Sequence, residues 1–251
     1  MATGSRCAGG PRRLKNRPAL RTLGGLGAFR HWRAGKVDLL YRNADQVART
    51  IEEVWAGVYH HDYDQQPTFG FCSTIYLGEI QICIPLFDPE GLIARLKARV
   101  EAYPPPLRHR VVAQELWNAE FALAFAEAHA AAGDVYNTAG CMARVAGSLT
   151  QALFALNETY FLGDKQAPKR LARFRLCPRD YLGRISRLLG CPGRDQAQLQ
   201  ASVEALRELW AEVVELAGEL YRPPFQLSSG HGPTPGGRPG GPAGGGPVPA
   251  E

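Results

Sequence analysis

The stretch Lys36-Val-Asp-Leu-Leu-Tyr-Arg-Asn43 decides how the first half of the chain is interpreted. Its apolar residues predict a buried strand over Val37–Tyr41, and Asp38 within it is the first acidic residue of the sequence. A buried carboxylate is too costly to leave unpaired. Asp38 is therefore expected either to bind a metal ion or to form an ion pair with a cation, for which Arg42 is the nearest candidate.

Charge is distributed unevenly along the 251 residues. Residues 1–36 contain nine Lys and Arg and no acid, and removing these nine charges from the net +5 leaves residues 37–251 at −4. The basic character therefore belongs to the N-terminal arm. Such an arm can contact nucleic acid, but it has no aromatic stacking residue before Phe29, so nucleic acid is not the expected partner.

Composition marks both ends of the chain as poorly ordered. Residues 1–35 are predicted to be a basic arm, and residues 226–251 a disordered tail, since residues 228–251 alone hold nine Gly and six Pro. The six cysteines form no C-x-x-C pair, which is typical of reduced thiols in a cytoplasmic protein. No apolar run is long enough to cross a membrane, so no membrane partner is expected.

Between these ends we expect two parts with different architectures. Residues 36–88 are predicted to begin with the strand, continue with a short helix through Val47, Ile51 and Val54, and end in β structure over Phe71–Phe87. The alternation of apolar residues changes phase at Gly78-Glu79 within that run, which predicts a bulge or a tight turn.

Residues 89–225 are predicted to be an all-helical bundle. Asp88-Pro89-Glu90 is a helix start, Pro104–Pro106 separates that helix from one ending near Ala132, and Gly133-Asp134 precedes a third over Val135–Phe161. Shorter helices are expected near residues 167–174 and 179–189. The last helix carries a packing seam at alternating spacings of four and three residues, at Leu199, Val203, Leu206, Trp210, Val213, Ala217 and Leu220.

Six short motifs, in this order and at this spacing, carry a family resemblance: Lys36–Asn43, Phe69-Gly-Phe71, Tyr76-Leu-Gly-Glu-Ile80, Pro85-Leu-Phe-Asp-Pro89, Gly133-Asp-Val-Tyr-Asn137 and Leu156-Asn-Glu-Thr-Tyr-Phe161. Together they resemble nucleotidyltransferase-domain proteins of the polymerase-β superfamily, the kanamycin nucleotidyltransferase-like proteins in particular. The resemblance covers about residues 36–225. It implies an α+β fold, with a truncated nucleotidyltransferase α/β core followed by the helical bundle.

The resemblance implies transfer of a nucleoside monophosphate from a Mg²⁺-bound nucleoside triphosphate to a hydroxyl on an acceptor such as a small molecule. Three carboxylates hold two Mg²⁺ ions in that family, and Asp38 resembles the third of them. The other two belong to a D-x-D or D-x-E pair upstream, where this sequence has no Asp or Glu. Activity of this chain alone is therefore in doubt, and a non-catalytic binding or interaction module derived from that family is the alternative.

Further candidate residues lie in the helical part. Glu120 is flanked three and four residues away by apolar side chains, a setting that raises a carboxyl pKa and suits a general base; a buried structural hydrogen bond is the other interpretation. Asn137, Arg144 and Gln151 share one polar stripe of their helix, beside glycines, and could line a substrate groove or simply face solvent. Lys165 resembles a basic residue that reaches the triphosphate, or is a cation near a helix end. The sequence leaves open whether the chain forms a homo-oligomer.

Overall fold

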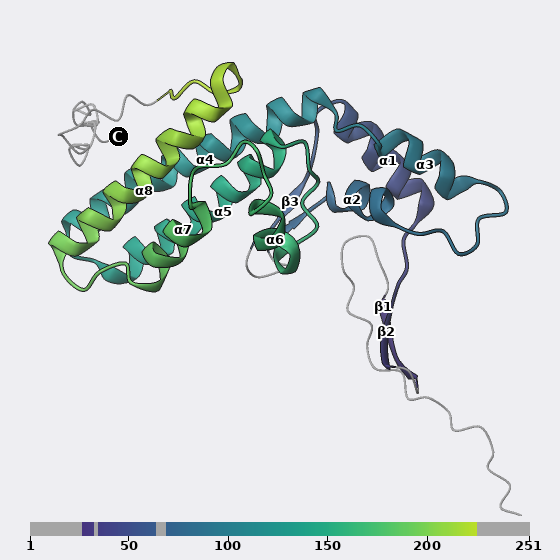
Figure 1. The fold of residues 1–251 in the computed structure, drawn as a ribbon, viewed down its shortest axis with the longest axis horizontal. Coiled ribbons are helices and arrows are strands. Elements are labelled where there is room, and N and C mark those ends of the chain that lie inside the picture. Colours follow the sequence, from purple (N-terminus) through teal and green to yellow (C-terminus); the bar gives the residue numbers. More distant parts are fainter. Residues whose placement is uncertain (1–26, 33–34, 64–68, 225–251) are drawn as a thin grey trace, which may run out of the picture. The chain divides into compact units, whose positions relative to one another are not determined.

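The computed structural model describes residues 27–32, 35–63 and 69–224. The described chain is mainly helical with two small antiparallel sheets, so the fold is α+β with a helical bundle, as predicted (Figure 1). It divides into a first unit, Met1–Arg108 with Thr159–Gln166, and a second unit, His109–Glu158 with Ala167–Glu251. This division falls later in the chain than the boundary at residues 88 and 89 expected from the sequence. None of the described helices is long and apolar enough to span a membrane.

The opening stretch forms a hairpin in the first unit. Strand β2 (Gly35–Leu40) pairs antiparallel with β1 (Gly27–Trp32), with Gly27 opposite Leu40 and Trp32 opposite Gly35. The expected strand is therefore present, although part of the expected N-terminal arm pairs with it. The expectation that this strand is buried is wrong at its described end, because Leu39 and Leu40 are 40% and 61% exposed. A two-stranded sheet has no second layer to cover its faces.

The helix that follows matches its prediction. Helix α1 (Ala44–Trp55) begins after Asn43, whose side chain accepts a hydrogen bond from the backbone N–H of Gln46 at 3.0 Å. Its apolar residues Val47, Ile51 and Val54 recur at helical spacing and are buried. The indole of Trp55 donates to the carbonyl of Arg99 at 3.0 Å, which ties α1 to α3.

The predicted β structure over Phe71–Phe87 is wrong. Only Phe71–Cys72 (β4) is a strand, paired with His61–Asp62 (β3), and the chain then forms helix α2 (Ile75–Ile82). Four consecutive residues, Ile75–Gly78, are buried, so the apparent phase change came from a helix covered on several sides. Gly78 lies against the side chains of Tyr160 and Leu162, where a side chain of its own would collide.

Helix α3 (Leu92–Val100) starts later than predicted. Gly91, at a φ of 65°, is its N-terminal boundary, yet the Asp88 carboxylate still accepts hydrogen bonds from the backbone N–H groups of Ile93 and Ala94 at 3.1 and 3.0 Å. Lys97 donates to the carbonyls of Ile80, Gln81 and Cys83 at the end of α2. Helices α1, α2 and α3 therefore form one packed group.

The last residue of α2 and the residues that follow it leave apolar side chains exposed. We call Ile82–Phe87 the exposed apolar segment. The exposed fractions reach 83% for Ile84, 94% for Leu86 and 83% for Phe87. These residues contribute little to the core of the first unit.

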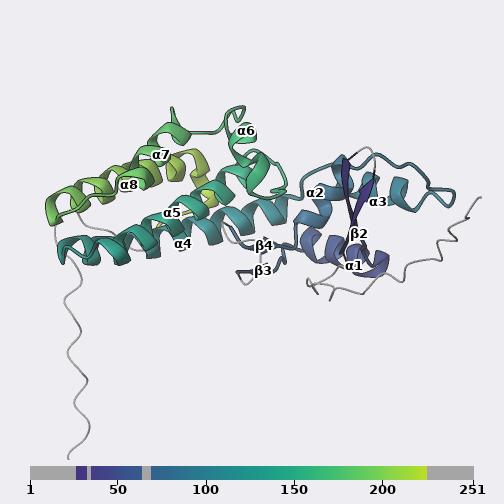
Figure 2. The same cartoon turned by 90° about the horizontal axis from the view of Figure 1, so that it is seen from below.

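The second unit is the predicted helical bundle. It contains most of α4 (Pro105–Ala131), together with α5 (Val135–Leu156), α6 (Ala167–Leu171), α7 (Tyr181–Gly190) and α8 (Gln196–Ala217). The long helices lie side by side, with α4 at one edge (Figures 1 and 2). Asp134 and Asp195 cap α5 and α8 by accepting hydrogen bonds from Asn137 and Gln198.

The α8 seam is buried as expected from Leu199 to Ala217, and the indole of Trp210 donates to the carbonyl of Leu116 on α4 at 3.3 Å. Helix α5, in contrast, ends five residues before the predicted Phe161. Asn157 closes it, and Glu158 has a left-handed φ of 50° that turns the chain away. Two short 3₁₀ turns, Asp164–Gln166 and Gly218–Leu220, complete the described elements.

Candidate anion-binding site

Asp38, the predicted metal ligand, lies in β2 at the register position opposite Phe29, and its side chain is outside the described part of the structure. Arg42, the alternative ion-pair partner, is bound by another carboxylate. Its Nε and Nη2 atoms donate to the two oxygens of Glu79 at 3.0 and 2.9 Å, a bidentate pair. The metal-ligand hypothesis for Asp38 stays a prediction.

Glu120 lies on an apolar stripe, as expected, and is fully buried. The hydroxyl of Tyr221 donates to its Oε2. Burial, and then the Glu120 carboxylate, raise the pKa of Tyr221, so the phenol keeps its proton. This arrangement is the buried structural hydrogen bond of the second interpretation, and a general base at this position would first have to be uncovered.

The three candidate residues on α5 share one face but have different surroundings. Asn137 is exposed, and its amide donates to the Asp134 carboxylate at 2.6 Å. Arg144 is exposed and forms no ion pair with the described residues. Gln151 is only 7% exposed, and its Nε2 has no hydrogen-bond partner among the described residues. A side chain added at Gly140 would meet nothing within 4 Å, so this glycine does not line a groove.

Lys165 lies in the 3₁₀ turn Asp164–Gln166 and is exposed. It belongs to the first unit, as Asp38 does, whereas Glu120 and the α5 residues belong to the second. The structure thus places the α5 residues on one helix of the second unit, and Asp38 and Lys165 in the first unit.

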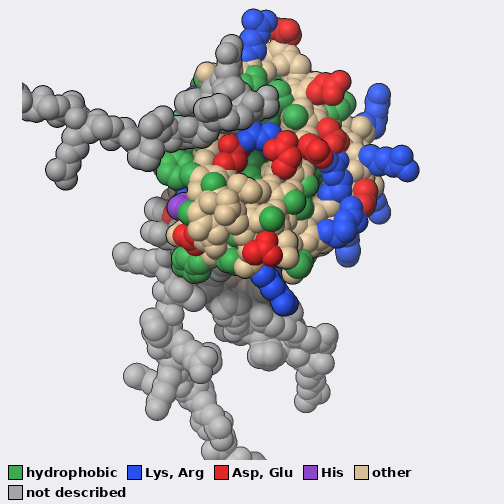
Figure 3. All heavy atoms as spheres, turned by 90° about the vertical axis from the view of Figure 1, so that its left-hand side faces the viewer, with side chains coloured by type: hydrophobic (Ala, Val, Ile, Leu, Met, Phe, Trp, Pro, Cys, Tyr) green, Lys and Arg blue, Asp and Glu red, His purple; other side chains and the backbone are tan. Residues whose placement is uncertain are grey.

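The strongest positive charge in the described second unit was not predicted from the sequence. Residues 169–179, which we call the basic segment, contain five cations and no acid: Lys169, Arg170, Arg173, Arg175 and Arg179. Four of them are exposed and Arg170 is half-buried. None forms an ion pair with any described residue. In Figure 3, Lys and Arg side chains gather mainly at the right of the view, with others at its top and bottom.

Apolar anchors alternate with these cations and hold the basic segment against the bundle. Leu171 is 4% exposed, and the ring of Phe174 meets that of Phe154 edge-on at 4.9 Å. Asn157 acts as a clamp, because its amide donates to the carbonyl of Leu176 at 2.8 Å and its oxygen accepts from the N–H of the same residue at 3.1 Å. The backbone is thereby positioned, and the charged side chains between the anchors are exposed, apart from the half-buried Arg170.

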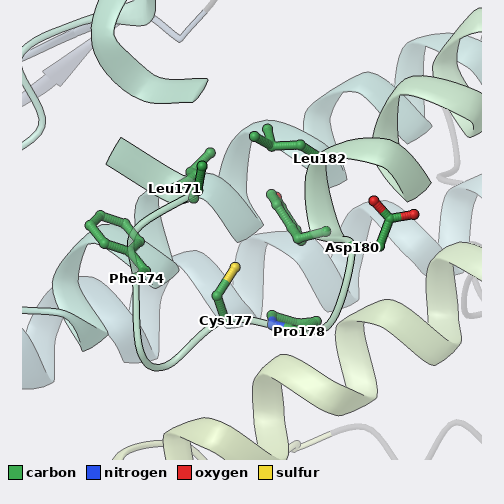
Figure 4. Close-up of a pocket in the computed structure, with 8 residues that line it drawn as sticks. Leu171, Phe174, Cys177, Pro178, Asp180 and Leu182 are labelled. Carbon is green, nitrogen blue, oxygen red and sulfur yellow. The ribbon is translucent and has the colours of Figure 1, made fainter. Parts of the chain in front are cut away.

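A pocket of about 320 Å³ lies beside this segment (Figure 4). It is lined mainly by the apolar anchors and the start of α7: Leu171, Ala172, Phe174, Cys177, Pro178, Asp180, Tyr181 and Leu182. Each Arg of the basic segment is adjacent in sequence to one of these lining residues. None of the five cations lines the pocket itself, and the charged residue of its described lining is Asp180.

The titratable side chains of the pocket lining are Cys177, Asp180 and Tyr181. Burial raises the pKa of the Cys177 thiol to about 11, so it is neutral at pH 7, and burial also raises the pKa of Tyr181. The Tyr181 hydroxyl lies inward, within 3.2 Å of the Thr150 hydroxyl. The Asp180 carboxylate points away from the other labelled side chains in Figure 4 and accepts from Arg187 at 2.9 Å.

A count of charge along the sequence could have found this segment, since it holds five cations in eleven residues without an acid. The pocket itself could not be found in this way. It depends on the Asn157 clamp and on the packing of Phe174 against Phe154, which join residues about twenty positions apart.

Comparison with known proteins gives a match to a protein family over part of the chain. A family described as a domain of unknown function, DUF4037, matches residues 77–165, a region that runs from α2 to the turn at Lys165. No curated protein and no solved structure matches the chain.

Proposed function

We propose that this chain binds a nucleoside triphosphate, with the phosphates on the basic segment and the base in the adjoining pocket, as part of a nucleotidyltransferase-like protein. The observation that carries the proposal is the basic segment, whose five cations form no ion pair with any described residue and alternate in the sequence with residues that line a pocket of the second unit. Four of the five are Arg, whose planar guanidinium can donate two parallel hydrogen bonds to a phosphate.

The pocket and the cations favour different parts of such a ligand. A volume of about 320 Å³ lies at the lower end of the range for small-molecule sites and suits one heterocycle rather than a whole nucleotide. The phosphates would remain near the surface, where the cations are. Because those cations are exposed, salt should screen the attraction strongly.

The resemblance adds the reaction to this binding function: transfer of a nucleoside monophosphate to a hydroxyl of a small-molecule acceptor. The described residues do not fit the two-Mg²⁺ site on which that reaction relies, because they contain no group of three His, Cys, Asp or Glu side chains placed to hold a metal ion. We therefore derive no catalytic step through Mg²⁺. Asp38 is the one proposed metal ligand, and the remaining carboxylates would have to come from outside the described residues.

The second candidate is a binding or interaction module without catalytic activity. The state of Glu120 favours it, since the only carboxylate proposed as a general base is fully buried and bonded to Tyr221. Nucleotide binding is common to both candidates, and only nucleotidyl transfer separates them.

Nucleotide binding is tested by titrating the full chain into fluorescently labelled ATP and GTP. Replacing both Arg173 and Arg175 by Glu should weaken binding by about tenfold or more, because two attractive charges become repulsive. Arg194→Glu, at another exposed position of the second unit, is the matched control and should change binding less than twofold. Equal affinity of the double variant and the wild type would refute the site.

Competition then identifies the ligand chemistry. ATP should compete better than tripolyphosphate, because only ATP also fills the pocket, and adenosine should compete poorly. Single-stranded RNA that binds far more tightly than ATP would favour nucleic acid instead. Pyrophosphate release from Mg²⁺-ATP with aminoglycoside acceptors should stay at background for this chain alone, and release well above background would rule out the non-catalytic candidate.

A further inference from the structure

A stripe of aromatic side chains lies exposed on helix α4. Trp117, Phe121 and Phe125 follow one another at intervals of four residues and are 37%, 45% and 49% exposed. Their rings are in contact along the helix, with centroid separations of 5.3 Å and 5.0 Å. We call the face that runs from Gln114 through these rings to Ala128 the aromatic stripe.

The aromatic stripe carries no charge over its whole length. The residues of this face are Gln114, Trp117, Asn118, Phe121, Ala124, Phe125 and Ala128. At 1.5 Å per residue it is about 21 Å long. Three adjoining large aromatic side chains are costly to leave in water, and contiguous apolar surface of this kind marks an interaction site. The bundle core lies on the opposite side of α4, where Leu116 and Leu123 are fully buried.

We propose that the aromatic stripe is a homodimer interface, in which α4 packs antiparallel against α4 of a second copy about a twofold axis at Phe121. The spacing of the stripe matches this symmetry. Trp117 and Phe125 each lie four residues from Phe121, so each would meet the other across the axis. Gln114 and Ala128 each lie seven residues away, so a long side chain would meet a short one.

Charge supports the antiparallel direction. Arg110, which is exposed and has no ion pair among the described residues, lies eleven residues before Phe121, and Ala132 lies eleven residues after it. The Arg110 guanidinium would therefore lie beside the C-terminal end of the partner's α4, where the helix dipole is negative and Asp134 follows. A parallel arrangement would instead place two Arg110 side chains together.

The size of the interface predicts its strength. A helix-to-helix contact about 21 Å long and one helix diameter wide is smaller than the roughly 800 Å² per partner of a standard stable interface. The dimer should therefore be in equilibrium with monomer at micromolar protein concentrations.

Sedimentation velocity of the full chain between about 1 and 100 μM tests this proposal. The wild type should shift from monomer to dimer over this range. Phe121→Glu should stay monomeric at 100 μM, because it buries two carboxylates at the axis. Leu189→Glu, which adds the same charge at a 41% exposed apolar residue of α7, should dimerise as the wild type does.

A second variant tests the interface in case Phe121→Glu fails to fold. Ala128 is an exposed helical position, so Ala128→Glu should fold normally and still weaken dimerisation at least fivefold. Phe121→Cys should form a disulfide-linked dimer under mild oxidation, whereas Ala143→Cys on α5 should not exceed the wild type. A monomeric wild type at 100 μM, a dimer unaffected by both Glu variants, or equal loss with Leu189→Glu would each overturn the proposal.

Discussion

Two segments of this chain, one in each unit, use their apolar residues in opposite ways. In the second unit, the α8 seam from Leu199 to Ala217 is buried against the bundle. In the first unit, the exposed apolar segment leaves Ile84, Leu86 and Phe87 more than 80% exposed. Long amphipathic helices can close a core among themselves, whereas short strands and helices need further layers to cover them. The comparison indicates that the described core depends on the helices far more than on the segment beside α2.

The largest expected effect tests this difference directly. Leu149 on α5 is fully buried, so Leu149→Ala should lower the free energy of unfolding by about 3 kcal/mol, the sum of lost apolar burial and a cavity. Leu86, which is 94% exposed, is the matched control, and Leu86→Ala should change stability by less than about 0.5 kcal/mol. Urea titrations followed by helical circular dichroism measure both. Comparable losses would show that Leu86 packs against something in solution.

A smaller effect is expected from the polar contact inside the second unit. Tyr221→Phe removes the hydroxyl that donates to the buried Glu120 carboxylate and should cost about 2 kcal/mol. Tyr136→Phe, at an 86% exposed ring, is the control and should be neutral. Thermal melts of both variants at pH 7 decide the point, and an unchanged melting temperature for Tyr221→Phe would remove this contact from the stability of the bundle.

The smallest expected effect is on the pH dependence of stability, and it comes from aspartates that accept backbone hydrogen bonds at helix starts in both units. The pKa of Asp134 lies below its usual value chiefly because its carboxylate accepts the backbone N–H of Asn137, and that of Asp88 is lowered in the same way by Ala94. A lowered carboxyl pKa stabilises the fold above the unfolded-state value of about 3.9, and this contribution is lost as the pH falls towards the folded-state pKa.

Asp134→Asn and Asp88→Asn keep a side-chain oxygen for the cap but remove the titrating group. Each variant should therefore lose less stability than the wild type between about pH 5 and pH 2. Melting temperatures across this range measure the slope. Identical slopes in wild type and variants would mean that these caps do not contribute to acid sensitivity.

Much of the helical part could be predicted because its boundaries have local chemical causes. Pro104–Pro106 and Gly133-Asp134 mark the ends of α4, and the regular spacing of α8 matches its buried seam. The secondary structure of the first unit was harder to predict from the sequence. The residues of α2 are apolar on several sides, and their pattern does not distinguish a buried helix from a strand. Their neighbours Tyr160 and Leu162 lie about eighty residues away in the sequence.

In the candidate sites, too, local sequence patterns could be predicted and contacts between distant residues could not. The apolar surroundings of Glu120 could be predicted from its own helix, but its partner Tyr221 is 101 residues away. The basic segment is evident in the sequence as a charge count, while the pocket beside it depends on contacts between α5 and the loop before α7. Local patterns predict which side chains share a face, and the partners of that face follow only from the tertiary packing.

Pro85 affects how readily the exposed apolar segment can pair with other chains. Ile82–Phe87 is six residues long, apolar and uncharged, which is the length and composition that favour cross-β aggregation. Proline has no backbone N–H and is excluded from central strands, so Pro85 interrupts the row of donors that another chain would need for pairing. Pro85 thereby lowers the tendency of this exposed segment to pair with strands of other chains.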